Sequence, residues 1–404
     1  MTIQIAVWTI ALAIGPTRIP QRQLIAEGFS TFAIVFMSLN LMLSTRASFL
    51  ERWLHGLDKL FVTHRTIGLT VALLIATHFL LVPKSVGYVA SKPFGYTTLA
   101  LLLTAIFIAS APRFPWSRLV PLKYQTWKFS HRFMGALVAL AVTHSLLGHT
   151  YVKTAPLLVA YVYGTASLGL IAWLYREFAF RHSGPFHTYN VERSRLLGGD
   201  VTEVTLASAS TVPTRTAGQF AFVSFENGPT REQHPFTISS GAHSDVRFSI
   251  KAAGDFTKDL LSGIPEASTA KVEGPYGAFD YHRGSRRQLW LAGGIGITPF
   301  LSMAEDLDAG TSVLLVWSVH DKQEAIYEQA LSRVSSEKPN FNLLVHSTSE
   351  RGHVDIGTLE FDAEPHDCSV FICGPVPMRR ALVRQLRSMG VARGQIHFEE
   401  FRLR

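Results

Sequence analysis

The chain has 404 residues, of which 47% are hydrophobic and 17% are charged, and its formal net charge is +8. This length allows two or three domains. The two cysteines, Cys368 and Cys373, are too few for a disulfide framework or a four-cysteine zinc site. Many basic residues flank apolar runs, which favours a role in membrane orientation over nucleic-acid binding.

The first 182 residues contain long apolar runs. A membrane-spanning helix needs about 20 mostly apolar residues. The first candidate segment is short, which leaves five spans as the alternative, and it lacks the basic start of a signal peptide. We predict an all-α bundle of six transmembrane helices in domain 1–182, with spans near residues 2–15, 23–44, 63–82, 96–112, 127–149 and 155–179.

Basic residues are unequally divided between the loops on the two sides of these spans. One side carries Arg46, Arg52, Lys59, Arg65, Arg113, Arg118, Lys123, Lys128, Arg132, Arg176 and Arg181. The other side carries Arg18, Arg22, Lys84, Lys92 and Lys153. The positive-inside rule places the richer side in the cytoplasm. We therefore predict a multi-pass protein of the cell (plasma) membrane whose C-terminal half is cytoplasmic.

Two of the predicted spans carry a pair of histidines each. His64 and His78 are fourteen residues apart, and His131 and His144 are thirteen apart, so each pair is separated by roughly 20 Å along its helix. Ionisable side chains within a membrane are costly and usually functional. Four imidazoles at two matched depths suit the axial ligation of two haems. The alternative is a set of core histidines that bond to backbone carbonyls.

The spacing of His131 and His144 does not fit a straight helix. Thirteen residues at about 100° each turn the second ring about 140° from the first. We therefore predict a distortion of this helix between the two histidines, such as a π-bulge, with Gly135 as a weak point. The alternative is that the rings approach their haems differently. His149, at the end of the same span, has no counterpart at the same step in the other helix and is not a predicted ligand.

Domain 183–285 alternates apolar and polar residues in short runs, which predicts a small antiparallel β-barrel. Within it, "HPFTISS" (234–240) follows a strand. "KAAGDFTKDL" (251–260) places Gly254 and Thr257 at the start of a helix, where an anionic phosphate can bind. The alternative for "HPFT" is a strand with a proline bulge.

Domain 286–404 alternates strands and helices, which predicts a parallel sheet with a site at the carboxyl ends of the strands. "GGIGITP" (293–299) follows the first strand and allows close approach of a pyrophosphate, although it is not a full G-x-G-x-x-G motif. "CGP" (373–375) ends a second strand beside the same crevice. Cys373 has a second interpretation as a small buried residue.

Taken in order, the membrane histidines, "HPFT", "GDFTKDL", "EGPYG", "GGIGITPF" and "CGP" resemble the NADPH oxidase and ferric reductase superfamily over almost the whole chain. The C-terminal half also resembles ferredoxin–NADP reductases. The resemblance implies that His64 and His131 ligate an inner haem b and that His78 and His144 ligate an outer one. It implies FAD as the flavin, and NADPH or NADH as the electron donor.

The resemblance also implies roles for the motif residues. The predicted FAD-binding set is His234, Pro235, Phe236, Thr237, Ser239, Lys251, Gly254 and Thr257. The predicted dinucleotide-binding set is Gly293, Gly294, Gly296, Thr298, Pro299, Ser318, His320, Cys373, Gly374 and Pro375. Three residues are predicted at the reaction centre: Thr237 at the flavin edge, Cys373 near the hydride path, and Phe401 over the flavin face. A C-terminal aromatic that simply docks on the domain is the alternative for Phe401.

The predicted function is electron transfer from cytosolic NAD(P)H through FAD and two haems to oxygen on the outer face, which yields superoxide. A ferric-chelate reductase and an electron-supplying module for a partner protein are the alternatives. We predict no obligatory protein partner, and the placement of the basic residues predicts no nucleic-acid partner. After the strand that ends at Trp317, relatives often place an arginine that binds the NADP 2′-phosphate. Here Ser318, His320 and Lys322 provide weak positive charge, which leans towards NADPH without a strict preference, and a solvated loop is the alternative.

Overall fold

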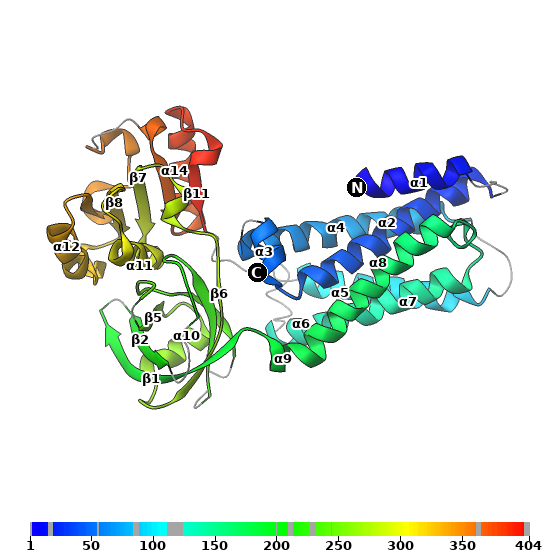
Figure 1. Cartoon of the computed structure of the whole chain (residues 1–404), viewed down its shortest axis with the longest axis horizontal. Coiled ribbons are helices and arrows are strands. Elements are labelled where there is room, and N and C mark those ends of the chain that lie inside the picture. Colours follow the sequence, from blue (N-terminus) through cyan, green and yellow to red (C-terminus); the bar gives the residue numbers. More distant parts are fainter. Residues whose placement is uncertain are drawn as a thin grey trace. The chain divides into compact units, whose positions relative to one another are not determined.

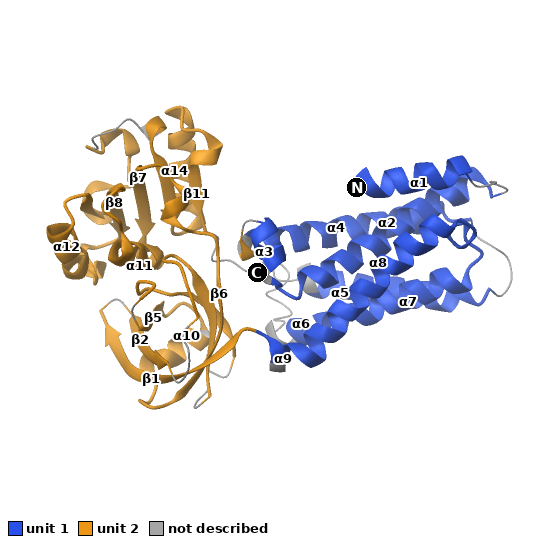
Figure 2. Ribbon diagram, viewed as in Figure 1, with its two compact units in different colours: residues 1–54, 59–184 blue, residues 55–58, 185–404 orange. Residues whose placement is uncertain are grey.

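The computed structural model describes residues 2–14, 19–54, 56–83, 89–110, 124–198, 200–208, 213–226, 232–243, 245–360 and 365–399 (Figure 1). The chain divides into two compact units (Figure 2). The helical unit comprises residues 1–54 and 59–184, and the sheet unit comprises residues 55–58 and 185–404.

The helical unit is built from long apolar helices and short connecting turns. Its elements are α1 (Thr2–Ile14), α2 (Gln21–Leu43), α3 (Ser48–Leu54), α4 (Leu57–Leu81), α5 (Ser91–Ser110), α6 (Tyr124–His131), α7 (Met134–Leu147), η3 (Tyr151–Thr154), α8 (Pro156–Leu174), the π-helical turn η4 (Tyr175–Ala179) and α9 (Phe180–Ser183). Within the described residues, four stretches are long and apolar enough to cross a membrane: Gln21–Leu43, Lys59–Leu81, Ser91–Ile108 and Pro156–Ala179.

The structure therefore agrees only in part with the predicted bundle of six spanning helices. The first predicted span is α1, which has only 13 residues. The fifth is divided into α6, with 8 residues, and α7, with 14 residues. The other four predicted spans each contain a helix of spanning length.

The division of the fifth span confirms the predicted distortion between His131 and His144. It lies at Arg132 and Phe133, just before Gly135, where the backbone makes two i→i+3 hydrogen bonds instead of α-helical ones. The carbonyl of Arg132 accepts a hydrogen bond of 2.8 Å from Trp173 Nε1 on α8. A Cβ at Gly135 would overlap the same indole ring, so Gly135 allows the approach of α8 that stabilises the break.

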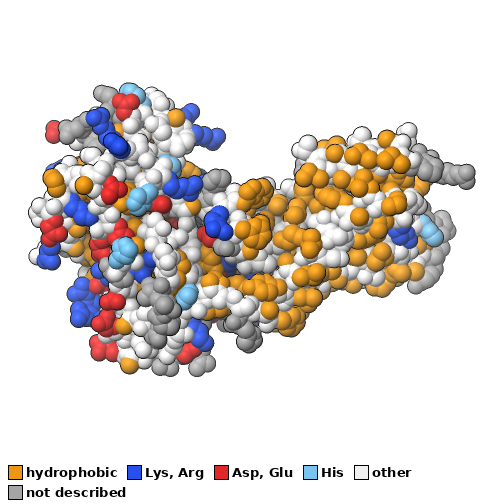
Figure 3. Space-filling view, viewed as in Figure 1, with side chains coloured by type: hydrophobic (Ala, Val, Ile, Leu, Met, Phe, Trp, Pro, Cys, Tyr) orange, Lys and Arg blue, Asp and Glu red, His pale blue; other side chains and the backbone are white. Residues whose placement is uncertain are grey.

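The surface of the helical unit is rich in apolar side chains (Figure 3). Leu69 and Leu73 on α4 are 62% and 68% exposed, and Phe107 on α5 is 52% exposed. Such side chains are unfavourable in water but are the normal outer surface of a helix in lipid. The interior of the unit instead contains close packing around Leu137, Val138 and their neighbours from α2, α4 and α5.

The first half of the sheet unit is a curled antiparallel sheet, as predicted for the FAD domain. Its strands are β1 (Phe186–Leu197), β2 (Val201–Ser208), β3 (Phe220–Phe225), β4 (His234–Thr237), β5 (Val246–Lys251) and β6 (Thr269–Tyr276), in the order β4-β3-β6-β1-β2-β5. An antiparallel bridge between Ile238 and Phe248 joins the two edges and curls the sheet towards a barrel. The short helix α10 (Asp255–Asp259) and turn η5 (Leu260–Ser262) follow β5.

The second half is the predicted parallel-sheet domain, with strand order β11-β10-β7-β8-β9. Its strands are β7 (Arg287–Gly293), β8 (Ser312–Val319), β9 (Phe341–Ser347), β10 (Ser369–Cys373) and β11 (Ile396–Phe398). Its helices are α11 (Thr298–Asp306), α12 (Glu328–Glu337), α13 (Thr348–Arg351) and α14 (Val376–Ser388). Short turns lie between elements: η6 (Tyr281–Arg283), η7 (Gly294–Ile297), η8 (Lys322–Glu324), η9 (Ile356–Thr358), η10 (Pro365–Asp367) and η11 (Arg393–Gln395). Strands β7 and β10 are neighbours, so "GGIGITP" and "CGP", which follow them, emerge side by side.

Candidate functional site

The four predicted haem ligands meet in two pairs within the helical unit. The ring centroids of His64 and His131 lie 5.9 Å apart, and those of His78 and His144 lie 6.5 Å apart. In each pair, one ring comes from α4 and the other from the predicted fifth span. The break between α6 and α7 lets both rings of that span meet their partners, which a straight helix does not allow.

These separations fit a metal held between two imidazoles. A nitrogen at about 2 Å from a metal puts the ring centre about 3 Å away, so a shared iron separates the two centres by roughly 6 Å. His78 Nδ1 lies 2.8 Å from the carbonyl oxygen of Ala26, and His144 Nδ1 lies 2.8 Å from that of Ser91. With Nδ1–H as the donor, Nε2 carries the lone pair that a metal requires.

The predicted flavin motif forms β4 at the edge of the antiparallel sheet. His234 stacks on Phe256 of α10 with a centroid separation of 3.9 Å, and Phe236 lies 6.1 Å from the same ring. Pro235 faces Phe222 in the ladder. The Thr237 hydroxyl is buried and has no hydrogen-bond partner within the described part of the chain. A buried orphan hydroxyl beside aromatic rings fits a bound polar ring such as a flavin.

Among the neighbouring residues predicted to bind FAD, one lies beside free space, and the others already contact protein groups. A Cβ at Gly254 would meet no atom within 4 Å, so the space before α10 is free. The Thr257 hydroxyl instead accepts hydrogen bonds of 2.8 and 2.9 Å from the N–H groups of Ala253 and Gly254, so it shapes the turn. Ser239 bonds to Ser249 at 2.9 Å, and Lys251 lies 3.4 Å from Glu324.

The glycine-rich loop is packed against the end of β10. Gly294 has φ +53°, a left-handed conformation that favours glycine, and a Cβ at Gly296 would overlap the carbonyl oxygen of Cys373. A Cβ at Gly374 would lie 3.1 Å from Gly293. Two peptide backbones thus approach without side chains between them. Thr298 and Pro299 begin α11 directly behind the loop, and Pro375 precedes α14.

Cys373 is fully buried at the end of β10. Burial, with a smaller contribution from the Glu399 carboxylate, raises the pKa of its thiol well above the ordinary value, although Arg379 opposes this shift. The thiol is therefore neutral at physiological pH and is not an activated nucleophile. Its side chain lies in the same core cluster as Phe300 and Phe371, which fits its second interpretation as a small buried residue.

The remaining predicted residues lie at the end of β8 or near the C-terminus. Ser318 is buried and faces Gly293 in the ladder, next to the glycine-rich loop. His320 is exposed, its backbone carbonyl accepts from Ser349 N at 3.0 Å, and its Nδ1 lies 3.5 Å from Thr348 Oγ1. Phe401 lies outside the described residues.

The structure adds residues that the sequence did not single out. Phe256 provides the stacking surface for His234, and Trp317 Nε1 donates a 2.9 Å hydrogen bond to the carbonyl of Gly294. Phe256 belongs to "GDFTKDL", but residue type alone carries no sign of either contact. The carbonyls of Ala26 and Ser91 had no sequence signal at all, because every residue has a carbonyl.

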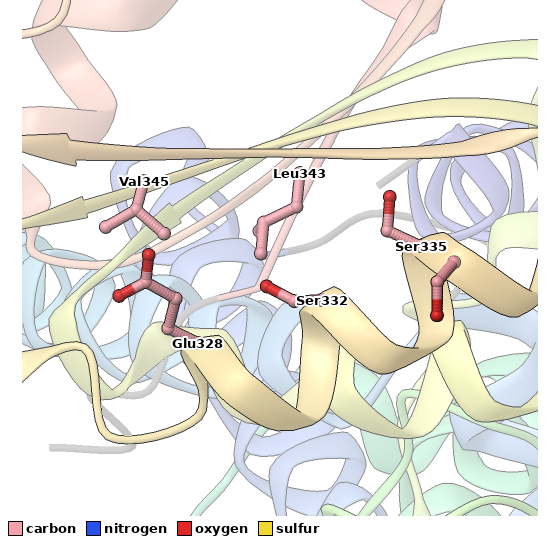
Figure 4. A pocket seen from close by; sticks show the side chains of 6 residues that line it. Glu328, Ser332, Ser335, Leu343 and Val345 are labelled. Atoms are coloured by element: carbon pink, nitrogen blue, oxygen red, sulfur yellow. The ribbon is translucent and has the colours of Figure 1, made fainter.

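A separate cavity of about 340 Å³ lies between α12 and β9. Figure 4 shows Glu328, Ser332 and Ser335 of the helix facing Leu343 and Val345 of the strand. None of the predicted site residues lines it. It therefore does not support the predicted flavin or dinucleotide chemistry.

Comparison with protein families agrees with the geometry of the sheet unit. Residues 187–280 match the FAD-binding domain family, and residues 290–384 match the oxidoreductase NAD-binding domain family. The sheet unit carries the domain pair of the ferredoxin–NADP reductase-like superfamily. The two matches meet at the junction between β6 and β7, and they support electron transfer between NAD(P)H and FAD.

Individual relatives agree with this assignment. The glycine betaine monooxygenase reductase subunit of Pseudomonas aeruginosa is 29% identical over 202 residues, which cover 46% of this chain and 55% of that protein. The flavohemoprotein of Bordetella pertussis is 28% identical over 257 residues, which cover 56% and 64%. The chain thus spans less than two thirds of the length of these relatives.

One solved structure resembles the whole chain in fold. The flavohemoglobin of Malassezia yamatoensis, with bound FAD and heme, has a TM-score of 0.52 and 18% identity, and the match covers 99% of both chains. At this identity, the likeness concerns the fold alone.

Proposed function

We propose that this protein is a membrane-bound NAD(P)H-dependent reductase in which the sheet unit reduces FAD and the helical unit conducts electrons through two b-type haems. FAD supplies the conversion of hydride into single electrons, and haem supplies the electron relay. The single observation that carries the helical half of this proposal is the meeting of His64 with His131 and of His78 with His144.

In this proposal, the motif residues of the sheet unit bind or position the two cofactors. The Thr237 hydroxyl supplies a hydrogen bond to the polar edge of the flavin, and Phe236 packs on the ring. The backbone at Gly294 and Gly296 approaches the dinucleotide pyrophosphate. Cys373 stays a neutral thiol beside the nicotinamide.

In the helical unit, the four histidines would hold the haem irons, and His78 and His144 would do so through Nε2. The Nδ1–H groups of His78 and His144 are oriented by the carbonyls of Ala26 and Ser91. Such outer hydrogen bonds fix the tautomer and raise the basicity of the ligand. The four apolar stretches and the excess of basic residues on one side support a multi-pass location in the cell membrane with a cytoplasmic sheet unit.

For the acceptor, the relatives support the alternatives better than superoxide formation. One relative is named as the reductase subunit of a glycine betaine monooxygenase and another as that of a carnitine monooxygenase, so each is by name one subunit of an enzyme with other subunits. We therefore favour electron delivery to a partner protein or ferric chelate. This weighs against the expectation that no protein partner is needed.

Oxygen is the second candidate because cations lie at the ends of the helices that carry the outer pair. Arg22 Nε donates to the carbonyl of Leu81, three residues after His78, at 2.9 Å. Lys153 Nζ donates to the carbonyl of Leu146, two residues after His144, at 3.0 Å. Positive charge near the outer pair favours an acceptor that becomes an anion on reduction.

The test is cytochrome c reduction in air by the purified, FAD-supplemented full chain with NADPH or NADH, with and without superoxide dismutase. Reduction that ignores the dismutase supports direct delivery to a metal centre or partner. Strong inhibition by the dismutase means that oxygen accepts the electrons. A protein that binds no haem after haem-replete expression would overturn the proposed role of the helical unit.

A further inference from the structure

Helix α11 connects the predicted dinucleotide site to the FAD domain within the sheet unit. It begins at Thr298, directly after the glycine-rich loop, and ends at Asp306. Its nine residues make a rod about 13 Å long. Pro299, Phe300 and the residues up to Ala304 are buried, so the rod is held firmly on the parallel sheet.

Two carboxylate side chains in the last turn of α11 accept hydrogen bonds from the backbone of the FAD domain. Glu305 Oε2 accepts a 2.7 Å hydrogen bond from Gly241 N, and Asp306 Oδ2 accepts a 2.7 Å bond from Ala242 N. Glu305 also forms an ion pair with Arg247 of β5. Hydrogen bonds to carboxylates are shorter and stronger than those between neutral groups.

These contacts fall on the segment that follows the flavin motif. Gly241 comes four residues after Thr237, in the chain that continues β4 towards β5. Its own carbonyl accepts a 2.7 Å hydrogen bond from the buried Arg215 guanidinium. A displacement of this segment therefore acts directly on the strand that carries Phe236 and Thr237.

A third contact lies in the middle of the helix. Ser302 Oγ accepts a 2.9 Å hydrogen bond from Gly218 N, just before β3, the strand that pairs with β4. Gly218 has φ +90°, and a Cβ there would overlap both the carbonyl oxygen of Phe279 and the terminal methyl group of Met303 on α11. The backbone of the FAD domain is thus seated against α11 at a position where no side chain fits.

We propose that Glu305, with Asp306 beside it, is a positioning residue for hydride transfer. The helix that supports the dinucleotide at its first turn fixes the flavin strand with its last turn, so it sets the approach of the nicotinamide to the flavin. Transfer between two bound rings depends steeply on their separation and alignment. This inference rests on the proposed function of the sheet unit.

The test compares FAD-loaded full-length wild type, Glu305→Ala, Glu305→Gln and Glu305→Asp by anaerobic stopped-flow reduction with NAD(P)H. Glu305→Ala is expected to lower the limiting rate of flavin reduction about tenfold, with the nucleotide dissociation constant unchanged within about twofold. Glu305→Gln keeps an acceptor for Gly241 but loses the charge, so an intermediate rate is expected, and Glu305→Asp should restore part of the loss.

Glu337→Gln is the matched control, because Glu337 is an exposed carboxylate at the last residue of α12. Flavin content and melting temperature are measured on every variant. A Glu305→Ala protein that retains FAD and reduces it at the wild-type rate would overturn the proposal, as would a rate lowered only in proportion to FAD loss. Wild type that reduces no bound FAD with either nucleotide would instead overturn the proposed function.

Discussion

The two units differ in how much of their large apolar side chains is exposed. Among the described residues, large hydrophobic side chains with high exposure are numerous in the helical unit, whereas in the sheet unit only Leu196 and Phe398 are of this kind. The cores of the sheet unit enclose residues such as Trp290 and Phe248 completely. The difference fits the proposed membrane location of the helical unit, because exposed apolar surface is stable in lipid and unfavourable in water.

Ionisable side chains are rare in the helices of the helical unit and common in the sheet unit. In the helical unit, the histidine pairs stand out because few ionisable groups share the apolar helices. In the sheet unit, ionisable groups are common, and many serve structure, as with Glu203, which accepts from Tyr327 at 3.2 Å and from Arg195 at 3.0 Å. Residue type is therefore a stronger sign of function in the helical unit than in the sheet unit.

The largest effect is expected from removing one outer histidine. His78→Ala should lower the haem content from two to one per chain and reduce acceptor reduction by more than about 100-fold, since even outer partners of metal ligands account for 10–100-fold. Flavin reduction by NAD(P)H in the sheet unit should persist. Haem content is measured as the pyridine haemochrome, and acceptor reduction with ferric citrate.

His149→Ala is the control, because within the described part of the chain the hydrogen bond of His149 is made by its backbone carbonyl, which accepts from Gln23 Nε2 at 3.1 Å. It should keep both haems. A His78→Ala protein with two haems would show that the pairing of rings does not reflect ligation.

A matched pair of substitutions tests the difference in solvent. Leu73 on α4 is 68% exposed and Leu196 on β1 is 60% exposed. Leu73→Arg should cost about 2–3 kcal/mol of membrane insertion, because a guanidinium is placed against lipid. Leu196→Arg should change stability by less than about 0.5 kcal/mol, as at most surface positions. The yield of carbonate-resistant membrane protein measures both, and equal yields would contradict the assignment of lipid to α4.

A smaller effect is expected from filling the glycine-rich loop. Gly296→Ala places a methyl group on the carbonyl oxygen of Cys373. The loop must shift, at a cost of about 1–3 kcal/mol, so KM for NAD(P)H should rise roughly tenfold while FAD is retained. Gly394→Ala is the control, because a Cβ there meets no atom within 4 Å. An unchanged KM in Gly296→Ala would place the dinucleotide elsewhere.

The smallest effect concerns the alkaline stability of the sheet unit. Burial, with a smaller contribution from Asp367, raises the pKa of Cys368 from 9.0 to about 11. The unfolded chain loses this proton first, so the stabilising contribution is complete below pH 9 and is lost as the pH rises from 9 towards 11. At pH 10 the loss is about 1 kcal/mol.

Cys368→Ala should remove that part of the pH dependence. Denaturant unfolding of the wild type and of the variant at pH 8 and pH 10 measures the difference in free energy. If the free energy of unfolding falls equally in the two proteins between pH 8 and pH 10, the buried thiol of Cys368 does not contribute to this pH dependence.

The sequence by itself determined the division into apolar and water-facing halves, the strand–turn–helix order around "GGIGITP", and the need for a break between His131 and His144. These follow from hydrophobic pattern, glycine placement and the fixed angle per residue of a helix, all of which are local properties. Residue spacing predicted that a break was required, but not that Arg132 and Phe133 would form it.

Only the tertiary structure decided which partners these residues meet. The location of the break depends on Trp173, which is 41 residues away from Arg132. The hydrogen bond from Gly241 N to Glu305 joins residues that are 64 positions apart in the sequence. Backbone carbonyls and N–H groups are the same at every residue, so their use as partners for His78, His144 or Glu305 leaves no mark in the sequence. It appears only when packing brings distant segments to hydrogen-bond distance.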